Sequence, residues 1–497
     1  MTTLDTHLPV LQVVAPMLIA PLVILLRPRG LAWAAATATS LMAFLIALQL
    51  TAGVLGGRVF RYALGSWAAP YGIELAVDSF NALLLLIVTA ASTLALLAGK
   101  ASLDGEIETS RQPLFFSAWL LALAGLAGIL VSADAFNIFV FMEISSLASY
   151  VLVAGGPDRR ALPAVFKCLV MGTIGATFYL IGVGLIYMMT GTLNLADMAL
   201  RIHQVADQKP ILVAAGFITV GLALKAALFP LHVWLPNAYT YAPHAVAVFL
   251  AACATKVALY VLLRFDFVVF QQNLLGHEAQ FAAFLMPLAV LAILVGSAVA
   301  MFQSNIKRLL AFSSVAQIGY ILLGASMVSA LGLSASLLQM FNHALAKGAL
   351  FLAVMCLATR FEGLELRQLA GAARQMPWTM GALVLSGLSL IGVPGTAGFI
   401  GKWYLISAAL NEGPLGIVLI AVVVIGSLMA VVYIWRIIEI AWFAPAADSV
   451  MRLGEAPLPM LSVTWLVALA NVYFGLVPSL PLDLSSTAAG SLLGYLP

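Results

Sequence analysis

Apolar segments about twenty residues long recur from one end of the chain to the other, and this repetition constrains the fold more than any other feature. A helix of about twenty apolar residues is needed to cross the hydrocarbon core of a membrane. The segments leave no gap for a soluble domain, and only 9% of the residues are charged, against about 25% in a soluble globular protein. The mean hydropathy is +1.09. The sequence therefore predicts an all-α polytopic membrane protein with one integral domain over residues 1–497.

The spacing of these segments predicts about fourteen transmembrane helices. Residues 58–75 form a polar and aromatic loop that is too short to span a membrane. Residues 1–8 contain no lysine or arginine, so they lack the basic region of a cleavable signal peptide, and we expect the first helix to remain in the protein. The predicted helices are 8–26, 31–54, 78–99, 112–132, 134–155, 163–190, 209–229, 244–264, 279–303, 307–329, 333–358, 378–410, 415–442 and 457–480.

Positive residues are distributed unevenly between alternate loops, and this bias predicts an orientation. Loops richer in lysine and arginine face the cytoplasm. We therefore expect both termini to lie outside, in a bacterial-type inner membrane. The predicted cytoplasmic side carries Arg27, Arg29, Lys100, Arg111, Arg159, Arg160, Lys307, Arg308, Arg360, Arg367, Arg374 and Arg452, and the other side carries Arg58, Arg61, Arg201, Lys209 and Arg264.

Several classes of site are excluded by the sequence. Cys168, Cys253 and Cys356 each lie alone in an apolar segment, so they predict neither disulfides nor a metal or iron–sulfur site. The chain contains no GxGxxG or GxxxxGK[ST] motif for a nucleotide. Its net charge of +3 is scattered, without a basic run for nucleic acid. We expect no cofactor and no metal, and we expect an ion gradient or partner subunits to supply the energy.

A helix break beside a buried charge is predicted in the seventh helix. Lys225 lies in an apolar run and is followed by Pro230 and Pro236. Proline lacks a backbone N–H and clashes with the carbonyl four residues earlier, so it opens the helix. Non-helical backbone at membrane depth is tolerated where it lines a wet cavity, so the break indicates an ion path, with His232 and His244 as secondary candidates. The alternative is a lysine that only extends to the membrane interface.

Other ionisable residues also lie inside predicted helices. Most arginines lie outside the helices, whereas five lysines lie within them, and a buried lysine can exchange protons while an arginine stays charged. A structural salt bridge, a lysine that extends to the interface and a histidine that is only hydrogen-bonded are the alternatives. The proton-transfer candidates are Glu143, Lys225, Lys256, His343, Lys347 and Lys402, with Glu439 as a secondary candidate and Lys167 as the fifth intrahelical lysine.

A second predicted break reverses the order of the first. Pro394 precedes Lys402, whereas Pro230 follows Lys225. Breaks of opposite sense in two halves of a membrane transporter indicate inverted repeats, with the ion site where they meet. The predicted divisions are residues 1–111 for helices one to three, 112–264 for the first five-helix unit, 279–442 for the second, inverted unit and 457–480 for the last helix.

Six segments, in order over roughly residues 110–410, carry a family resemblance: FNIFVFMEISSLASYVL, LKAALFPLHVWLPNAY, APHAVAVFLAACATKVALY, NIKRLLAFSSVAQIGY, NHALAKGALFL and GVPGTAGFIGKWY. They resemble the proton-translocating family shared by antiporter-like subunits of respiratory complex I, membrane-bound hydrogenases and the Mrp multisubunit Na⁺/H⁺ antiporters. The resemblance implies fourteen helices and a chain of buried charges across the membrane midplane. In that chain Glu143 pairs with Lys225, and the charges continue through Lys256, His343, Lys347 and Lys402.

Within this family the chain looks most like the D subunit of the Mrp antiporters, because it stops soon after the last helix. It carries Lys402 where some relatives have glutamate, which fits the D subunit and also other complex I subunits. The segment HVWLP at 232–236 leans toward the complex I and hydrogenase members. The resemblance implies proton transfer in a cation/proton antiporter, with hydrophobic partner subunits and Na⁺ as the expected exchanged ion. The alternative is the pumping subunit of an NADH–quinone oxidoreductase or hydrogenase. A solute carrier or a scaffold fits the buried amines less well.

Overall fold

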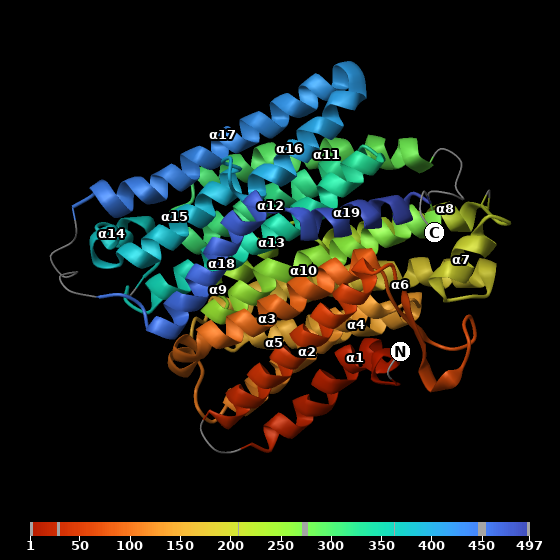
Figure 1. Cartoon of the computed structure of the whole chain (residues 1–497), viewed down its shortest axis with the longest axis horizontal. Coiled ribbons are helices and arrows are strands. Elements are labelled where there is room, and N and C mark those ends of the chain that lie inside the picture. The colour runs from red at the N-terminus through yellow and green to blue at the C-terminus, as the bar shows by residue number, and fades with distance from the viewer. Residues whose placement is uncertain are drawn as a thin grey trace.

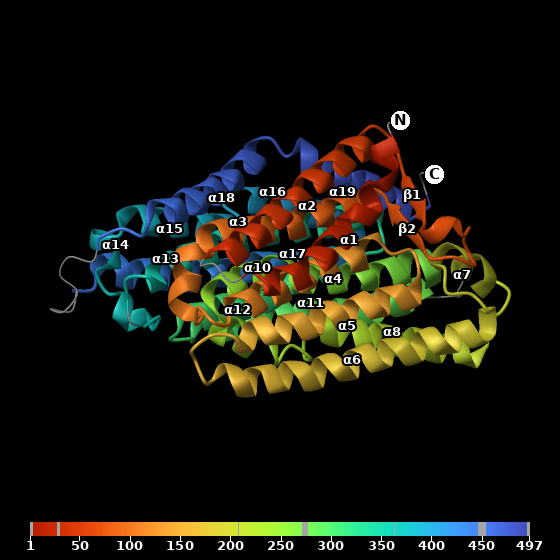
Figure 2. The ribbon, with the colours of Figure 1, turned by 90° about the horizontal axis from the view of Figure 1, so that it is seen from below.

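A computed structural model describes residues 3–26, 30–206, 208–270, 277–361, 363–445 and 454–494. Long helices lie side by side between two ends of the molecule (Figure 1). The short helix α7 (Leu195–Ile202) marks one end and α14 (Ala372–Gln375) marks the other, in both views (Figure 2). The predicted all-α membrane fold is confirmed.

Three long helices open the chain: α1 (Thr3–Ile24), α2 (Leu31–Leu55) and α3 (Ser79–Glu106). Between α2 and α3 lies an antiparallel hairpin of β1 (Phe60–Ala63) and β2 (Glu74–Val77), where the sequence predicted only a loop. The hairpin lies at the α7 end of the molecule (Figure 2).

The first unit contains five passes, and its fourth is broken. α8 ends at Lys225 and α9 resumes at Leu235, so the two pieces together form one pass. A π-helical turn, Phe265–Phe270, extends the fifth pass beyond the predicted end at residue 264. The elements are α4 (Gln112–Val131), α5 (Ala135–Ala154), α6 (Ala161–Thr190), α8 (Lys209–Lys225), α9 (Leu235–Tyr241) and α10 (His244–Arg264).

The second unit repeats this plan. Its fourth pass is broken between α15 and α16, where Gly392 and Gly395 adopt positive φ angles on either side of Pro394. Left-handed backbone of this kind favours glycine. The elements are α11 (His277–Met301), α12 (Ile306–Ser326), α13 (Ala330–Ala358), α15 (Pro377–Ile391), α16 (Ala397–Ala409) and α17 (Gly413–Phe443), with 3₁₀ turns at Leu366–Leu369 and Leu410–Glu412.

Corresponding helices of the two units pack on corresponding neighbours. The first helix of each unit contacts the second, the third contacts the broken pair, and the fifth returns to the first. α8 begins beside α7, whereas α15 begins beside α14 at the opposite end (Figure 1). The broken passes therefore run in opposite directions. This arrangement agrees with the predicted inversion, and the unit boundaries stay predictions.

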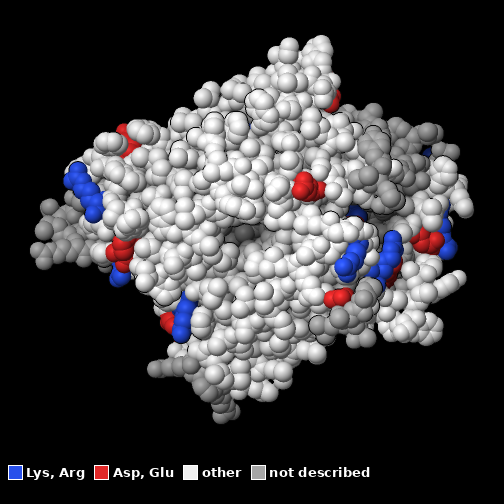
Figure 3. All heavy atoms as spheres, viewed as in Figure 1, with Lys and Arg blue, Asp and Glu red and all other residues white. Residues whose placement is uncertain are grey.

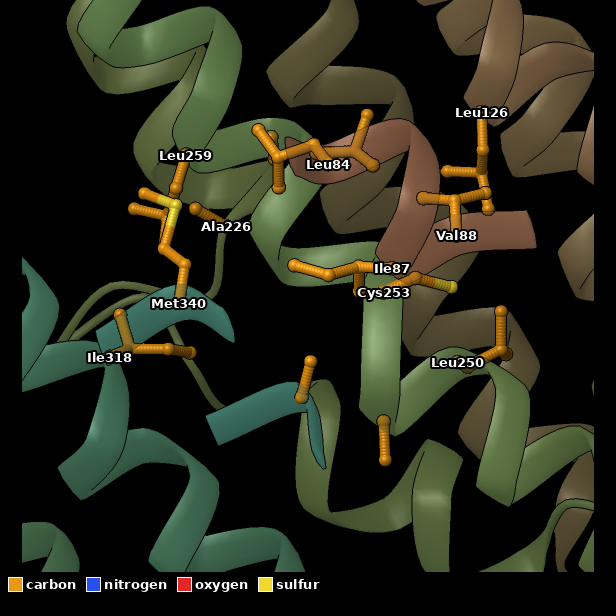
Figure 4. Close-up of a cluster of buried hydrophobic side chains, with 14 of the residues drawn as sticks. Leu84, Ile87, Val88, Leu126, Ala226, Leu250, Cys253, Leu259, Ile318 and Met340 are labelled. Atoms are coloured by element: carbon orange, nitrogen blue, oxygen red, sulfur yellow. The ribbon is translucent and has the colours of Figure 1, made fainter. Parts of the chain in front are cut away.

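Apolar side chains from both units and from α3 meet around α10. Trp119 of α4 stacks on Phe249 of α10 with ring centroids 5.0 Å apart. Burial on all sides brings the single lysine of α10, Lys256, into the centre of the molecule, where it is fully buried. Figure 4 labels Leu84, Ile87, Val88, Leu126, Ala226, Leu250, Cys253, Leu259, Ile318 and Met340 in this cluster.

The surface and the helix lengths both fit a membrane. Charged side chains gather toward the two ends of the visible face, and the surface between them is almost uncharged (Figure 3). Twelve helices of the described residues are long and apolar enough to span, if Ala397–Phe443 is taken as one. That run turns back at Gly413, and α8 with α9 supplies one more pass, so the described residues make fourteen passes, as the sequence predicted.

The last pass differs from its prediction. The sequence predicted a helix over 457–480, but α18 (Leu458–Leu476) is followed by α19 (Ser479–Leu492). The polar residues of α19 lowered its hydropathy, so this piece was missed. α1 begins and α19 ends at the same end of the molecule (Figure 1). Which side of the membrane that end faces stays a prediction, and Arg27, Arg29 and Arg452 lie outside the described residues.

Candidate functional site

Lys225, the last residue of α8, forms an intramembrane ion pair. Its Nζ donates to Oε1 of Glu143 at 3.3 Å and to Oγ of Ser146 at 2.7 Å. Glu143 and Ser146 lie three residues apart on one face of α5. Gly175 of α6 leaves room for the lysine stem, since a Cβ there would come within 3.4 Å of Lys225 Cγ and 2.8 Å of a carbonyl of α8. The structure thus brings together the pair that the family resemblance implied.

The break after Lys225 is closed by the chain itself. The backbone N–H of Ala226 donates to Leu222, and the indole Nε1 of Trp234 donates to the carbonyl of Leu224 at 2.9 Å. Pro230 lies in this turn, whereas Pro236 lies in the first turn of α9, where proline is tolerated. Freed carbonyls near the break therefore have donors without help from the lysine.

A cavity of about 100 Å³ lies beside the ion pair. The polar side of this cavity is formed by Lys225, Ser146 and Tyr150. Another side is formed by Trp234 and Tyr239 of the broken segment. The cavity reaches α10 at Ala254, Val257 and Ala258, which flank Lys256 in sequence. It is the space through which Lys225 and α10 face each other.

Three ionisable residues continue from α10 into α13. Lys256 donates to the carbonyl of Ala251 at 2.5 Å, so its side chain bends back toward the start of its helix. Lys347 donates to the carbonyl of Leu310 at 2.6 Å and to the hydroxyl of Ser313. Both ammonium groups lie within electrostatic reach of His343, whose two ring nitrogens are buried without a protein partner in the described residues. Unpaired buried nitrogens of this kind are normally satisfied by water.

Lys402 of α16 reaches back across the second break. Its Nζ donates to the carbonyls of Ile391 at 2.6 Å and Leu390 at 3.3 Å, and to Oγ of Ser427 at 2.8 Å. The ammonium also lies 4.8 Å from the ring centroid of Tyr320. These carbonyls end α15, and the negative end of a helix favours a cation.

A second cavity, of about 220 Å³, opens from Lys402 to the surface between α16 and α17. Its rim includes Trp403, which is 57% exposed, and Leu428, which is 60% exposed. Lys402 is therefore buried from water but lies close to the lateral face of the molecule.

Sequence reasoning missed a set of buried amides between His343 and Lys402. Gln339 Nε2 donates to Gln317 Oε1 at 2.7 Å, and Gln339 Oε1 and Asn342 Nδ2 have no protein partner among the described residues. Gly401, next to Lys402, packs on these amides, because a Cβ at that position would come within 2.8 Å of Asn342 Nδ2. Uncharged amides inside apolar helices were the signal that could have found them.

The secondary candidates lie apart from this chain of charges. His232 stacks on Phe229 in the broken segment, and its Nδ1 has no protein partner in the described part of the chain. His244 begins α10. Glu439 is exposed near the end of α17 and forms no salt bridge with a described residue, and Lys167 is exposed on α6. No three His, Cys, Asp or Glu residues of the described ranges are grouped as metal ligands.

Comparison with known proteins identifies relatives over nearly the whole chain. A family model described as "NADH:quinone oxidoreductase/Mrp antiporter, TM" matches residues 132–430. The N subunit of NADH-quinone oxidoreductase from Desulforudis audaxviator is 40% identical over 92% of this chain and 90% of its own length. The D subunit of the Na⁺/H⁺ antiporter from Alkalihalophilus pseudofirmus is 30% identical over 74% of this chain and 73% of its own length.

A solved structure agrees with the fold. A chain of the Mrp complex from Dietzia sp. DQ12-45-1b superposes with a TM-score of 0.90 and 27% sequence identity, over 99% of this chain and 98% of that one. The higher identity to an N subunit of NADH-quinone oxidoreductase means that the expected assignment to the D subunit of the Mrp antiporters is not confirmed by these relatives.

Proposed function

Because the chain belongs to the NADH:quinone oxidoreductase/Mrp antiporter transmembrane family, we propose that it translocates protons through the buried residues from Glu143 to Lys402. The single observation that carries the proposal is the Glu143–Lys225 pair at a helix break inside the membrane. Intramembrane acids and lysines are costly and commonly mark ion pathways. The cavity beside Lys225 supports a path on one side of Lys256. The ring nitrogens of His343 on α13, which have no partner among the described residues, support a path on the other side.

The proposed step begins with the ion pair. Glu143 and Ser146 stabilise the ammonium of Lys225 in a medium of low polarity. When Glu143 is protonated or moves, the ammonium loses its counter-charge and the neutral amine is favoured. The released proton crosses the cavity toward Lys256 on α10.

The second half of the step uses residues of the second unit. His343 lies within electrostatic reach of Lys256 and Lys347, and neither of its ring nitrogens has a partner among the described residues, so it can accept a proton on one nitrogen and release one from the other. The amides of Gln317, Gln339 and Asn342 then supply hydrogen-bonding groups toward Lys402. Lys402 exchanges its proton near the lateral face of the molecule.

Two complexes are candidates for the source of energy. The 30% identity to the D subunit of a Na⁺/H⁺ antiporter over 74% of the chain favours a monovalent cation (Na⁺)/H⁺ antiporter of the Mrp class, in which this chain takes the place of the D subunit. The 40% identity to an N subunit over 92% of the chain favours a redox-driven NADH–quinone oxidoreductase or a related complex. In both, the chain has hydrophobic partner subunits and performs no redox chemistry itself.

The first experiment purifies the tagged chain in mild detergent and identifies its companions by mass spectrometry. Hydrophobic subunits without redox centres support the antiporter, and flavin or iron–sulfur subunits support the redox-driven complex. Proton transport is then measured in vesicles that contain the intact complex.

The decisive variant is Glu143→Gln, which keeps the shape of the side chain but removes the charge. We expect the rate of proton transport to fall by about tenfold or more. A tenfold change corresponds to the loss of about 1.4 kcal/mol of interaction with the charged form of the lysine. Asp483→Asn is the matched control, because Asp483 is an exposed acid of α19. Full transport by a correctly assembled Glu143→Gln complex would show that the ion pair is structural.

A further inference from the structure

A second group of charges, partly or fully buried, holds the joint between α9 and α10. The joint is Ala242–Pro243. Nζ of Lys307, at the start of α12, donates to the carbonyl of Ala242 at 2.7 Å. Oε2 of Glu106, at the end of α3, accepts from the backbone N–H of His244 at 3.0 Å. An ammonium therefore holds the last carbonyl before the joint, and a carboxylate holds the first N–H after it.

The Lys307 contact is buried and the Glu106 contact is partly buried, although both lie at the ends of helices. Lys307 was placed by the sequence among the cations of the cytoplasmic loops, but it is only 3% exposed. Glu106 and Lys307 interact electrostatically across the joint, and Lys307 also acts on His244. The Nδ1 of His244 is buried without a protein partner among the described residues. The joint thus carries three ionisable groups, one of which has a free nitrogen.

Charged residues of the loop between α5 and α6 complete the surroundings of the joint. Arg160 lies over the ring of Tyr241, the last residue of α9, at 4.9 Å, and is paired with Asp158 at 2.8 Å. Asp158 acts electrostatically on Lys307, and Glu365 acts on Arg160. Within the cluster the acid nearest to the joint is Glu106, whose other oxygen accepts from Ser102.

The joint is connected to the Lys225 cavity by only seven residues of helix. Trp234, Ala238 and Tyr239 at the start and middle of α9 line that cavity. Trp234 also closes the break through its bond to Leu224. Because α9 is short and its far end is held by Lys307, the joint and the wall of the cavity belong to one short segment.

We propose that Glu106, His244 and Lys307 form a proton-binding latch on the α9–α10 joint, and that it controls access to the Lys225 cavity. A proton on Glu106 removes the counter-charge of Lys307 and weakens the acceptor for the N–H of His244, because hydrogen bonds to ionised groups are about twice as strong as neutral ones. α9 then loosens and the cavity opens toward the face that holds the joint. Its use in transport rests on the proposed function, but the latch itself does not.

Cys168 provides a native reporter that does not depend on transport. It lines the cavity, and its Sγ lies 3.8 Å from the carbonyl of Trp234. Cys253 lies in the core of α10 and is fully buried. The intact complex is treated with N-ethylmaleimide at one pH, and modification of each cysteine is followed by mass spectrometry. We expect Glu106→Gln and Lys307→Gln to raise the rate at Cys168 about fivefold, with Cys253 unmodified.

Two matched variants complete the test. Asp104→Asn removes an exposed acid of the same helix, whose partner is Gln112, and leaves the rate at Cys168 unchanged. Lys307→Arg keeps the positive charge, so its modification rate at Cys168 stays close to that of the unaltered protein.

Equal rates at Cys168 in all variants, including no reaction in any, would overturn the latch. Modification of Cys253 together with Cys168 in Glu106→Gln would also overturn it, because general unfolding rather than local opening would then explain the result. If the latch is supported while Glu143→Gln transports normally, only the proposed function fails.

Discussion

The two helix breaks share one plan but neutralise their lysines differently. At the first break Lys225 has a carboxylate partner, Glu143, and the carbonyls freed by the break are occupied by backbone N–H groups and Trp234. At the second break Lys402 itself occupies the freed carbonyls, and no described carboxylate lies within salt-bridge distance of it. The comparison teaches that the second unit again has a lysine beside its break, on the other side of the break, but does not repeat the charge partner of that lysine. Lys225 is paired with one acid inside the chain, whereas Lys402 has no described acid beside it and lies close to the lateral face.

The largest expected effect tests what the two lysines share. Arginine keeps the positive charge but does not release its proton in proteins. We therefore expect Lys225→Arg and Lys402→Arg to assemble and to lose proton transport by about tenfold or more, measured in vesicles with the intact complex. Lys167→Arg, at an exposed position of α6, is the control and retains transport. Normal transport by one of the two arginine variants would show that only the other lysine carries a proton.

A smaller effect separates the two breaks. Removing one partner of a buried ion pair leaves an uncompensated charge, so Lys225→Met and Glu143→Gln should be coupled in a double-mutant cycle of thermal stability. We expect a coupling of about 1–3 kcal/mol, below the ~3–5 of fully buried pairs, because Glu143 is 28% exposed. The equivalent cycle of Lys402→Met with Ser427→Ala should give the smaller coupling, because Ser427 carries no charge and the ammonium of Lys402 keeps its bonds to Ile391 and Leu390 when the hydroxyl is removed. Equal coupling in the two cycles would remove the distinction between the breaks.

The amides beside the second break provide a test of the connection to His343. We expect Gln339→Leu to assemble normally and to reduce proton transport by roughly threefold to tenfold, because it removes a hydrogen-bonding group from an otherwise apolar stretch. Gln12→Leu is the control, since Gln12 of α1 is also a buried glutamine whose side-chain atoms have no partner among the described residues. Unchanged transport in Gln339→Leu would place the path elsewhere.

The smallest effect concerns the loop between α5 and α6, which contacts the α9–α10 joint through Arg160 and Tyr241. A hydrogen bond from Arg160 lowers the pKa of Asp158 below its ordinary value. A lowered pKa in the folded state contributes stability above the unfolded pKa, and this contribution is lost as the pH falls through the folded value. Asp158→Asn should therefore lower thermal stability by under about 1 kcal/mol, and by the same amount at about pH 6 and pH 8. A difference between the two pH values would mean that another group controls the loop.

The helices were largely predictable because each apolar segment must satisfy its own backbone in a membrane. The two breaks were also predictable, because proline and glycine act locally. The end of the chain was not: α19 contains Asp483 and several serines, and its helix is supported by packing on α3 and α13 rather than by hydropathy. The hairpin before α3 was missed for a similar reason, since its pairing joins short segments that carry little periodicity.

The candidate site, like the fold, was predictable only in part. The pairing of Glu143 with Lys225 came from the family resemblance, and the structure brings the two side chains together. The amides of α12 and α13 and the burial of Lys307 were not foreseen, because an isolated polar residue at a helix end or inside a helix has several environments open to it. Only neighbouring helices decide whether such a residue faces lipid, water or another polar group.

The sequence by itself determined that this chain is a multi-pass helical membrane protein with two helix breaks of opposite sense and lysines beside them. These properties follow from hydropathy over a membrane thickness and from the local geometry of proline and glycine. Tertiary structure alone decided how each lysine is neutralised, which amides join the path and which charges hold the α9–α10 joint. Those properties depend on contacts between residues up to 138 positions apart, as between Glu106 and His244, and no local pattern in the sequence specifies which distant helix supplies the partner.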